Sequence, residues 1–265
     1  MYMSMSEDEV DLLQLNALST RVVQGIKLTA EHWGRIIESD GWLSSQVIDA
    51  RLKQLQEMHR HNLYLPTGFF PLMCPRADHR EFVVDYPRIS SWTRPEKLPS
   101  GSKSIFTLNR LFIPINKGNA HWMLVIVEMK REGGAVREKP LISFYDSLES
   151  DVMEGGEGQG RAYCDAVKSY LESEAREKLG DEGEPAHPGT FRVQPRTPEA
   201  APRQHNRSDC GILMLHYIEE LSNDLPRQEL SLKYLTQKEI SRLRRGLILK
   251  LSADENTISS ATAPP

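Results

Sequence analysis

Three cysteines are few for a chain of 265 residues. Cys74, Cys164 and Cys210 cannot form the kind of disulfide framework that stabilises small secreted domains. Basic residues are not in excess either, because 33 Lys and Arg stand against 37 Asp and Glu, a net charge of −4. A protein that binds many phosphates needs clustered Lys and Arg, so we do not expect nucleic acid as a partner.

Long apolar runs are absent as well. No stretch approaches the roughly 18 apolar residues that a membrane span requires, so a membrane is not an expected partner. The first residues, MYMSMSEDEVDLL, carry acids where a secretory signal has a basic region. With so few cysteines, this predicts a protein of a reducing, intracellular compartment. No Cys/His cluster has the spacing of a zinc site, so neither a metal nor another cofactor is expected.

What is present is an ordinary globular composition, with 39% apolar and 26% charged residues. The length suits one large domain or two small ones. We predict a helical or loosely ordered lead-in over residues 1–25, one folded domain over 26–251, and a disordered tail over 252–265 that lacks apolar residues.

The order of periodic segments predicts an α+β fold. Strand-like runs rich in Ile, Val, Phe and Tyr lie at residues 110–116, 121–129 and 141–145. Short links favour an antiparallel meander of these three strands. Helical periodicity is found at residues 28–39, 44–55, 163–178, 211–221 and 237–251. Loops rich in Gly, Glu, Pro or charge are expected at residues 130–140, 155–160 and 180–201, the last around a short strand at 190–194.

Cys210 lies where a loop meets a predicted apolar helix. The thiolate is the nucleophilic form of cysteine, and the amides and partial positive charge of a helix N-terminus favour that anion. The same amides can bind an oxyanion that forms on an attacked carbonyl. A free cysteine is more often a small buried apolar residue, and this is our interpretation of Cys74 and Cys164.

A nucleophilic cysteine needs a base, and the base needs an orienting partner. His121 begins one predicted strand and Asp146 follows the end of the next, so antiparallel pairing would bring them together. His205, in the loop before Cys210, is a rival base. We interpret His216, on the following helix, as a packing or surface residue.

Four segments in this order carry a resemblance: Trp42-Leu43, IPINKGNAHW at 113–122, FYDS at 144–147 and QHNRSDCG at 204–211. The chain resembles the Ulp/SENP family of cysteine proteases, which process and remove SUMO and related ubiquitin-like modifiers. The resemblance covers residues 28–251. It implies a papain-like fold with a central, mostly antiparallel sheet flanked by helices, and a catalytic cysteine at a helix N-terminus.

The resemblance also implies roles for single residues. Cys210 would be the nucleophile, His121 the general base and Asp146 the residue that orients the imidazole. Gln204, six residues before Cys210, would donate to the oxyanion. Trp42 and Trp122 would roof a tunnel for the modifier's C-terminal Gly-Gly, although ordinary core packing is the alternative for both.

Substrate preference is left open by the departures from the family pattern. Ser45 stands where the family usually has an Asp that can contact the modifier's tail, and segments 130–140 and 150–203 are extended. A Nedd-type modifier is an alternative substrate. A third interpretation is a non-catalytic binder of ubiquitin-like proteins on the same fold. The presence of all four residues of the proposed catalytic set argues against it. A transferase that uses the same fold is a further alternative. We also expect a monomer. The family resemblance implies a nuclear or nucleocytoplasmic location.

Overall fold

The computed structural model describes residues 20–75, 77–78, 81–129, 131–132, 135–136, 139–148, 158–180, 191–195, 197, 201–222 and 235–253. Most of the predicted lead-in, nearly all of the predicted tail and most of the 180–201 segment lie outside the described residues.

A five-stranded sheet runs through the middle of the molecule, in the order β11–β10–β7–β6–β3. The strands β6 (Arg110–Lys117), β7 (His121–Glu128) and β10 (Leu141–Tyr145) pair antiparallel, which confirms the predicted meander. The edge strands β3 (Asn62–Tyr64) and β11 (Arg192–Gln194) pair parallel with β6 and β10. The sheet is therefore antiparallel along its three central strands and parallel only at its two short edges.

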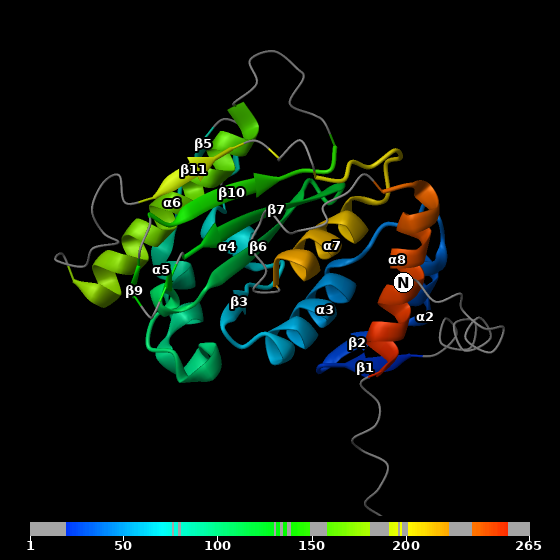
Figure 1. The fold of residues 1–265 in the computed structure, drawn as a ribbon, viewed down its shortest axis with the longest axis horizontal. Coiled ribbons are helices and arrows are strands. Elements are labelled where there is room, and N and C mark those ends of the chain that lie inside the picture. Colours follow the sequence, from blue (N-terminus) through cyan, green and yellow to red (C-terminus); the bar gives the residue numbers. More distant parts are fainter. Residues whose placement is uncertain are drawn as a thin grey trace, which may run out of the picture.

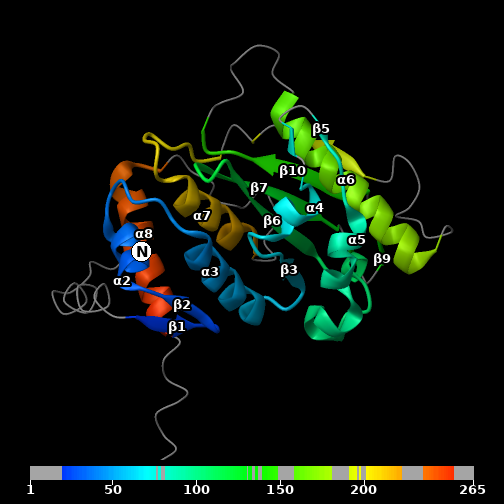
Figure 2. The same ribbon diagram turned by 180° about the vertical axis from the view of Figure 1, so that it is seen from behind.

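Helices cover both faces of this sheet (Figures 1 and 2). One face carries α3 (Ser45–Met58), α7 (Cys210–Ser222) and α8 (Gln237–Ser252), and the other carries α4 (Phe69–Met73), α5 (Tyr86–Ile89) and α6 (Gly158–Leu179). Side chains of β7 alternate between two separate apolar cores, as the period of a strand requires. Burial on both faces explains why β7 is a continuous apolar run in the sequence.

The predicted lead-in is wrong for the part that the structure describes. β1 (Arg21–Val23) and β2 (Ile26–Leu28) form an antiparallel hairpin. Gln24 and Gly25, with φ of 50° and 75°, make the two-residue turn, whose positive φ values suit the twist of a hairpin. Val23 is 3% exposed and packs in the same core as α3 and α7, so the hairpin belongs to the folded unit. The strands are too short for a periodic pattern to reveal them.

The helices match their predicted positions closely. Ser44 caps α3 by accepting the Val47 amide at 3.4 Å, and α2 (Ala30–Ile37) follows Thr29, whose amide donates to His32 Nδ1 at 2.9 Å. The predicted loop at residues 155–160 is wrong at its end, because α6 already begins at Gly158. Gly160 is required there for close packing, since a Cβ would lie 2.0 Å from the carbonyl oxygen of Pro195.

The segment between β3 and β6 has more structure than its sequence suggested. It contains α4, α5, the short strands β4 (Ala77–Asp78) and β5 (Glu81–Phe82), and four 3₁₀ turns between Ser90 and Thr107. The fully buried Glu174 of α6 holds this segment against the helix by accepting hydrogen bonds from Tyr86 Oη at 2.8 Å and Thr93 Oγ1 at 2.7 Å. Lys178, one turn later on α6, supplies the opposite charge at 2.5 Å, and the two hydroxyl donors come from residues distant in the sequence, which local patterns do not show.

Candidate active site

The ends of three elements meet on one side of the sheet: the start of β7, the end of β10 and the N-terminus of α7. The antiparallel register pairs Tyr145 with Leu124, so the residue after β10 comes level with the beginning of β7. There, His121 Nε2 lies 2.6 Å from Asp146 Oδ1. The predicted meeting of this histidine with this aspartate is confirmed.

Asp146 is held by several neighbours and is 5% exposed. Its Oδ1 also accepts the Leu148 amide at 2.8 Å. Its own amide donates to Thr197 Oγ1 at 2.7 Å, and its carbonyl accepts from Arg203 Nη1 at 2.9 Å. The carboxylate therefore has a fixed direction, toward the imidazole.

The surroundings of His121 favour its charged form. Burial alone would lower the pKa of the imidazole, but the hydrogen bonds and negative charges of Asp146 and Cys210 outweigh it and raise the pKa of His121 to about 9. The second ring nitrogen, Nδ1, is buried and has no partner at full hydrogen-bond geometry among the described residues. Because Nε2 faces Asp146, Nδ1 is the atom left to exchange a proton with the cysteine.

Cys210 is the first residue of α7 and is 2% exposed. The helix therefore begins at the cysteine itself, one residue before the predicted start. Gly211 follows, and a Cβ there would lie 3.1 Å from both Leu43 Cβ and Trp122 Cδ1. The N-terminus of α7 is thus packed closely against the chain before α3 and the start of β7.

Gln204 lies beside Asp146 and is held through both ends of its amide. Its Oε1 accepts from Ser147 Oγ at 2.6 Å, and its Nε2 donates to the Asn206 carbonyl at 2.6 Å. Its main-chain amide donates to the Ser147 carbonyl at 3.0 Å. An amide nitrogen has two hydrogens, so one remains for another acceptor.

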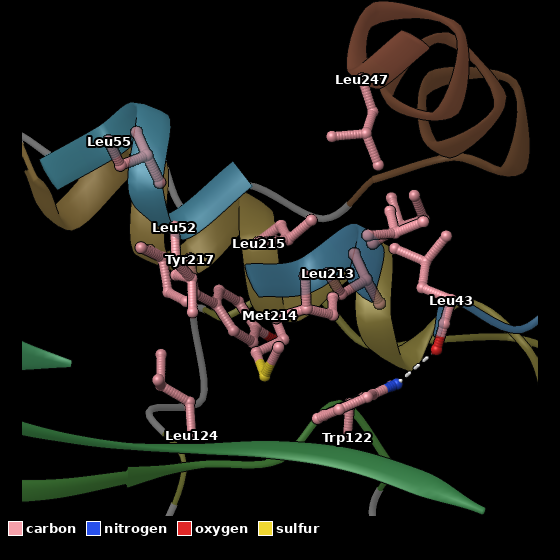
Figure 3. Packing of buried hydrophobic residues seen from close by; sticks show 14 of the residues in the cluster. Leu43, Leu52, Leu55, Trp122, Leu124, Leu213, Met214, Leu215, Tyr217 and Leu247 are labelled. Carbon is pink, nitrogen blue, oxygen red and sulfur yellow. Dashed lines mark hydrogen bonds between the residues drawn. The ribbon is translucent and has the colours of Figure 1, made fainter. Parts of the chain in front are cut away.

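The two tryptophans occupy different environments. Trp122 is 4% exposed in the core below α7, and its Nε1 donates to the Leu43 carbonyl at 2.9 Å (Figure 3). Trp42 is 39% exposed, which removes the core alternative for this side chain. Ser45, the first residue of α3, is partly exposed just after it.

The rival residues have other environments. Cys74 and Cys164 are buried free thiols whose pKa burial raises to about 12, as befits packing residues. His205 is exposed on the loop before α7, unlike the buried imidazole of His121 beside its aspartate. His216 is 8% exposed, and burial lowers the pKa of its imidazole. It is therefore a packing residue, one of the two roles that we expected.

Several supporting residues were missed from the sequence. Ser147 and Asp209 stand inside the FYDS and QHNRSDCG segments, which could have drawn attention to them. Arg244 of α8, which pairs with Asp209 at 2.6 Å, had no such signal, because it lies 34 residues after Cys210. Among the described residues, no group of three or more His, Cys, Asp or Glu could hold a metal ion. No helix in the same residues is both long and apolar enough to cross a bilayer.

A cysteine at a helix N-terminus, beside a histidine that an aspartate orients, is the arrangement of a thiol hydrolase. The sequence profile of the Ulp1 protease family, C-terminal catalytic domain, matches residues 41–255. The chain therefore belongs to the Ulp1 protease family, a family of cysteine peptidases.

Individual relatives agree with this assignment. Human sentrin-specific protease 5 is 26% identical over 217 residues, which are 81% of this chain and 23% of that protein. Ubiquitin-like-specific protease ESD4 of Arabidopsis thaliana is 27% identical over 86% of this chain and 42% of its own length. The chain thus spans about a quarter to two fifths of these relatives.

A solved structure has the same fold. The C-terminal Ulp1 protease domain in complex with Smt3, the yeast orthologue of SUMO, superposes with a TM-score of 0.70 at 20% identity. The superposition covers 95% of this chain and 97% of that one. The predicted fold class is confirmed.

Proposed function

We propose that the protein is a thiol protease that cleaves after the C-terminal Gly-Gly of a SUMO-like modifier. The observation that carries this proposal is the 2.6 Å contact between His121 and Asp146 next to Cys210 at the start of α7. The solved complex of a relative of the same fold with a SUMO orthologue supports the choice of modifier. Substrates include the modifier's precursor and its conjugates.

In the proposed reaction, His121 takes the Cys210 proton, and the sulfur attacks the carbonyl carbon of the second glycine. The oxyanion binds to the Cys210 amide and to the free N–H of Gln204. Imidazolium then gives its proton to the leaving amine, the C–N bond breaks, and a thioester remains on Cys210. His121 next deprotonates a water molecule, which attacks the thioester and releases the modifier's carboxylate and the thiol.

The two tryptophans near Cys210 explain, in this proposal, why the modifier must end in Gly-Gly. We infer that Trp42, which is 39% exposed before α3, and Trp122 of β7, which lies against Gly211 at the start of α7, border a narrow passage to Cys210. A substrate end that lacks side chains fits such a narrow passage, and only glycine lacks a Cβ. Ser45 would face the modifier's tail close by.

A panel of modifier probes tests both reaction and substrate. The protein is incubated with vinyl sulfones built on the C-terminal Gly-Gly of SUMO, Nedd8 and ubiquitin, and adducts are located by peptide mass spectrometry. We expect the SUMO probe to modify Cys210, and Cys210→Ser to remove the adduct while the protein still binds the modifier. An adduct that survives in Cys210→Ser but disappears in Cys164→Ser would overturn the assignment of the nucleophile. Preference for the Nedd8 probe would support the alternative substrate.

The location and assembly of the protein stay proposals as well. We propose a monomeric state, and a nuclear or nucleocytoplasmic location that the family resemblance implies. Imaging of the tagged chain and light scattering test them directly.

A further inference from the structure

Asp209, the residue directly before Cys210, is 0% exposed. It stands at the N-cap of α7, because its carbonyl accepts the Leu213 amide at 2.9 Å. An aspartate at this position ordinarily turns its carboxylate onto the free amides of its own helix. Among the described residues, no α7 amide donates to the carboxylate of Asp209, so the carboxylate has been drawn away from the helix.

Side chains from elsewhere hold the carboxylate instead. Arg244 of α8 donates to Oδ1 from Nε at 2.8 Å and from Nη2 at 2.6 Å. Gln237, also on α8, donates to Oδ2 at 2.9 Å, and Asn206 donates to the same oxygen at 2.7 Å. The carboxylate thus has four donors, none from the first turn of α7.

Arg244 is itself fixed from several sides and is 3% exposed. Its Nη1 donates to the carbonyls of Arg35 and Ile36 at the end of α2, at 3.3 and 3.5 Å. Its Nη2 also donates to the Ser208 carbonyl at 3.3 Å. The carbonyls at a helix C-terminus favour a cation, so α2 and the loop before Cys210 together set the place of the guanidinium.

The arrangement has two consequences for Cys210. The carboxylate of Asp209 does not cap the first turn of α7, so the partial positive charge of this helix end stays available to a thiolate. The negative charge of Asp209, next in sequence to the sulfur, is compensated by the guanidinium instead of opposing a thiolate. The compensation of the charge depends on Arg244, and the placement of the carboxylate depends on Arg244 together with Gln237 and Asn206.

We infer that Arg244 is a positioning residue for the nucleophile: it holds Asp209 away from the start of α7 and neutralises its charge. This inference rests on the proposed function, in which Cys210 attacks as a thiolate. Helix α8 is then part of the active-site machinery, although it contributes no group to the reacting atoms.

Alkylation by iodoacetamide tests the inference, because it needs the thiolate but neither an oxyanion hole nor the modifier. The charged groups that bear on Cys210 are His121 of β7, Asp146 and its neighbour Arg203, and the pair Asp209–Arg244. Arg244→Met leaves Asp209 uncompensated, so we expect alkylation at neutral pH about 10-fold slower and its pH dependence moved to higher pH. Cleavage of a modifier substrate should also fall by about 10-fold in kcat/KM, since the attack on the substrate needs the same thiolate.

The double variant Asp209→Asn/Arg244→Met removes the charge that Arg244 compensates. We expect alkylation to return to within about 3-fold of the wild type, because no negative charge then lies beside the sulfur. Arg244→Lys keeps a positive charge without the planar fork and should be intermediate. It also serves if Arg244→Met does not fold, and equal alkylation of Arg244→Lys and wild type would then count against the inference.

Arg51→Met is the matched control, because Arg51 is also a buried arginine in an ion pair, with the partly buried Glu219 of α7 at 2.8 Å. We expect it to lower the melting temperature but to leave the pH dependence of alkylation unchanged. The inference is wrong if folded Arg244→Met alkylates like the wild type, or if the double variant is as slow as Arg244→Met. If wild-type Cys210 itself reacts no faster than Cys164, the proposed function fails rather than the role of Arg244.

Discussion

His121 Nε2 and Asp146 Oδ1 lie 2.6 Å apart, and this contact sets the chemistry at the scale of single residues. The carboxylate fixes the tautomer of the imidazole, which leaves Nδ1 for the cysteine. Asp146→Asn keeps the shape of the side chain but presents an N–H that favours the wrong tautomer. We expect kcat to fall by about 10⁴-fold, by analogy with the serine triad, in steady-state assays with a fluorogenic modifier. A loss of less than about 10-fold would show that Asp146 does not orient the base.

The same pair makes stability depend on pH. The pKa of His121 is raised from 6.5 to about 9, so its protonation stabilises the folded state fully below about pH 6.5. That contribution is lost as the pH rises through about 9. We expect the melting temperature of the wild type to fall between about pH 6.5 and 9 by about 2–4 °C more than that of Asp146→Asn. Parallel melting curves for the two proteins over this range would contradict the raised pKa.

Ser147 adds a further prediction at this scale. It is 2% exposed and its hydroxyl donates to Gln204 Oε1, so it helps to hold the amide in an orientation that leaves one of its two N–H groups for an oxyanion. Gln204→Ala should reduce kcat by about 10²–10³-fold. We expect Ser147→Ala to reduce kcat by about 10-fold with little change in KM, and to add nothing to Gln204→Ala.

The double variant Ser147→Ala/Gln204→Ala separates two explanations. If Ser147→Ala damaged the structure in general, its loss of kcat would add to the loss caused by Gln204→Ala. Additive losses in kcat would therefore show that Ser147 acts through something other than the amide of Gln204. Iodoacetamide reacts without an oxyanion, so the alkylation rate of Cys210 should not change in Ser147→Ala.

At the scale of elements, the site depends on how closely α7 approaches β7 and the chain before α3. A Cβ on Gly211 would come within 3.1 Å of Leu43 and Trp122, which are themselves packed in the core. Gly211→Ala should therefore cost about 1–3 kcal/mol of unfolding free energy and displace the start of α7. We also expect a loss of about 10²-fold in kcat/KM, because small displacements of a nucleophile are costly.

Gly246→Ala is the matched control for this prediction. Gly246 lies inside α8, and a Cβ added there would have no atom within 4 Å, so alanine should stabilise the helix by up to about 1 kcal/mol. Urea unfolding of both variants checks that Gly211→Ala lowers the unfolding free energy and that Gly246→Ala raises it. A Gly211→Ala protein as stable and as active as the wild type would contradict the close packing.

At the scale of the whole molecule, specificity should come from what the passage to Cys210 excludes. Substrates that end in Gly-Gly should be cleaved at least about 10²-fold faster, in kcat/KM, than the same substrates ending in Gly-Ala. Trp42→Ala should narrow this difference with little change in melting temperature, because Trp42 is 39% exposed. Trp122→Ala should also destabilise the protein by about 3–5 kcal/mol, since it empties a core position. Equal cleavage of both substrates by the wild type would contradict the exclusion of side chains from this passage.

The sequence predicted those parts of the molecule whose signals are local. Strands β6, β7 and β10 are dense in apolar residues, and antiparallel pairing of the successive strands β7 and β10 brings the start of one to the end of the other, where His121 and Asp146 meet. The hairpin before α2 is too short for periodicity to reveal. Arg244 could not be found from the sequence, because its role depends on packing between distant segments.

The edge strands of the sheet were also beyond what local sequence patterns can predict. β3 and β11 are three residues each, and their parallel pairing depends on crossovers that local patterns do not specify. The short elements between β3 and β6 are hydrogen-bonded to Glu174, which belongs to a helix much later in the chain. Long-range burial, rather than local propensity, decides these parts of the fold.

In the proposed reaction Cys210 carries the modifier as a thioester, and rapid acid quenching with intact-mass analysis detects this intermediate. Mixing the wild type with a SUMO precursor should give, within the first turnover, a protein heavier by the mature modifier minus one water. The adduct should map to the Cys210 peptide, be released by hydroxylamine, and be absent from Cys210→Ala. Turnover of the precursor without any hydroxylamine-sensitive adduct, or with one on Cys74 or Cys164, would contradict the account.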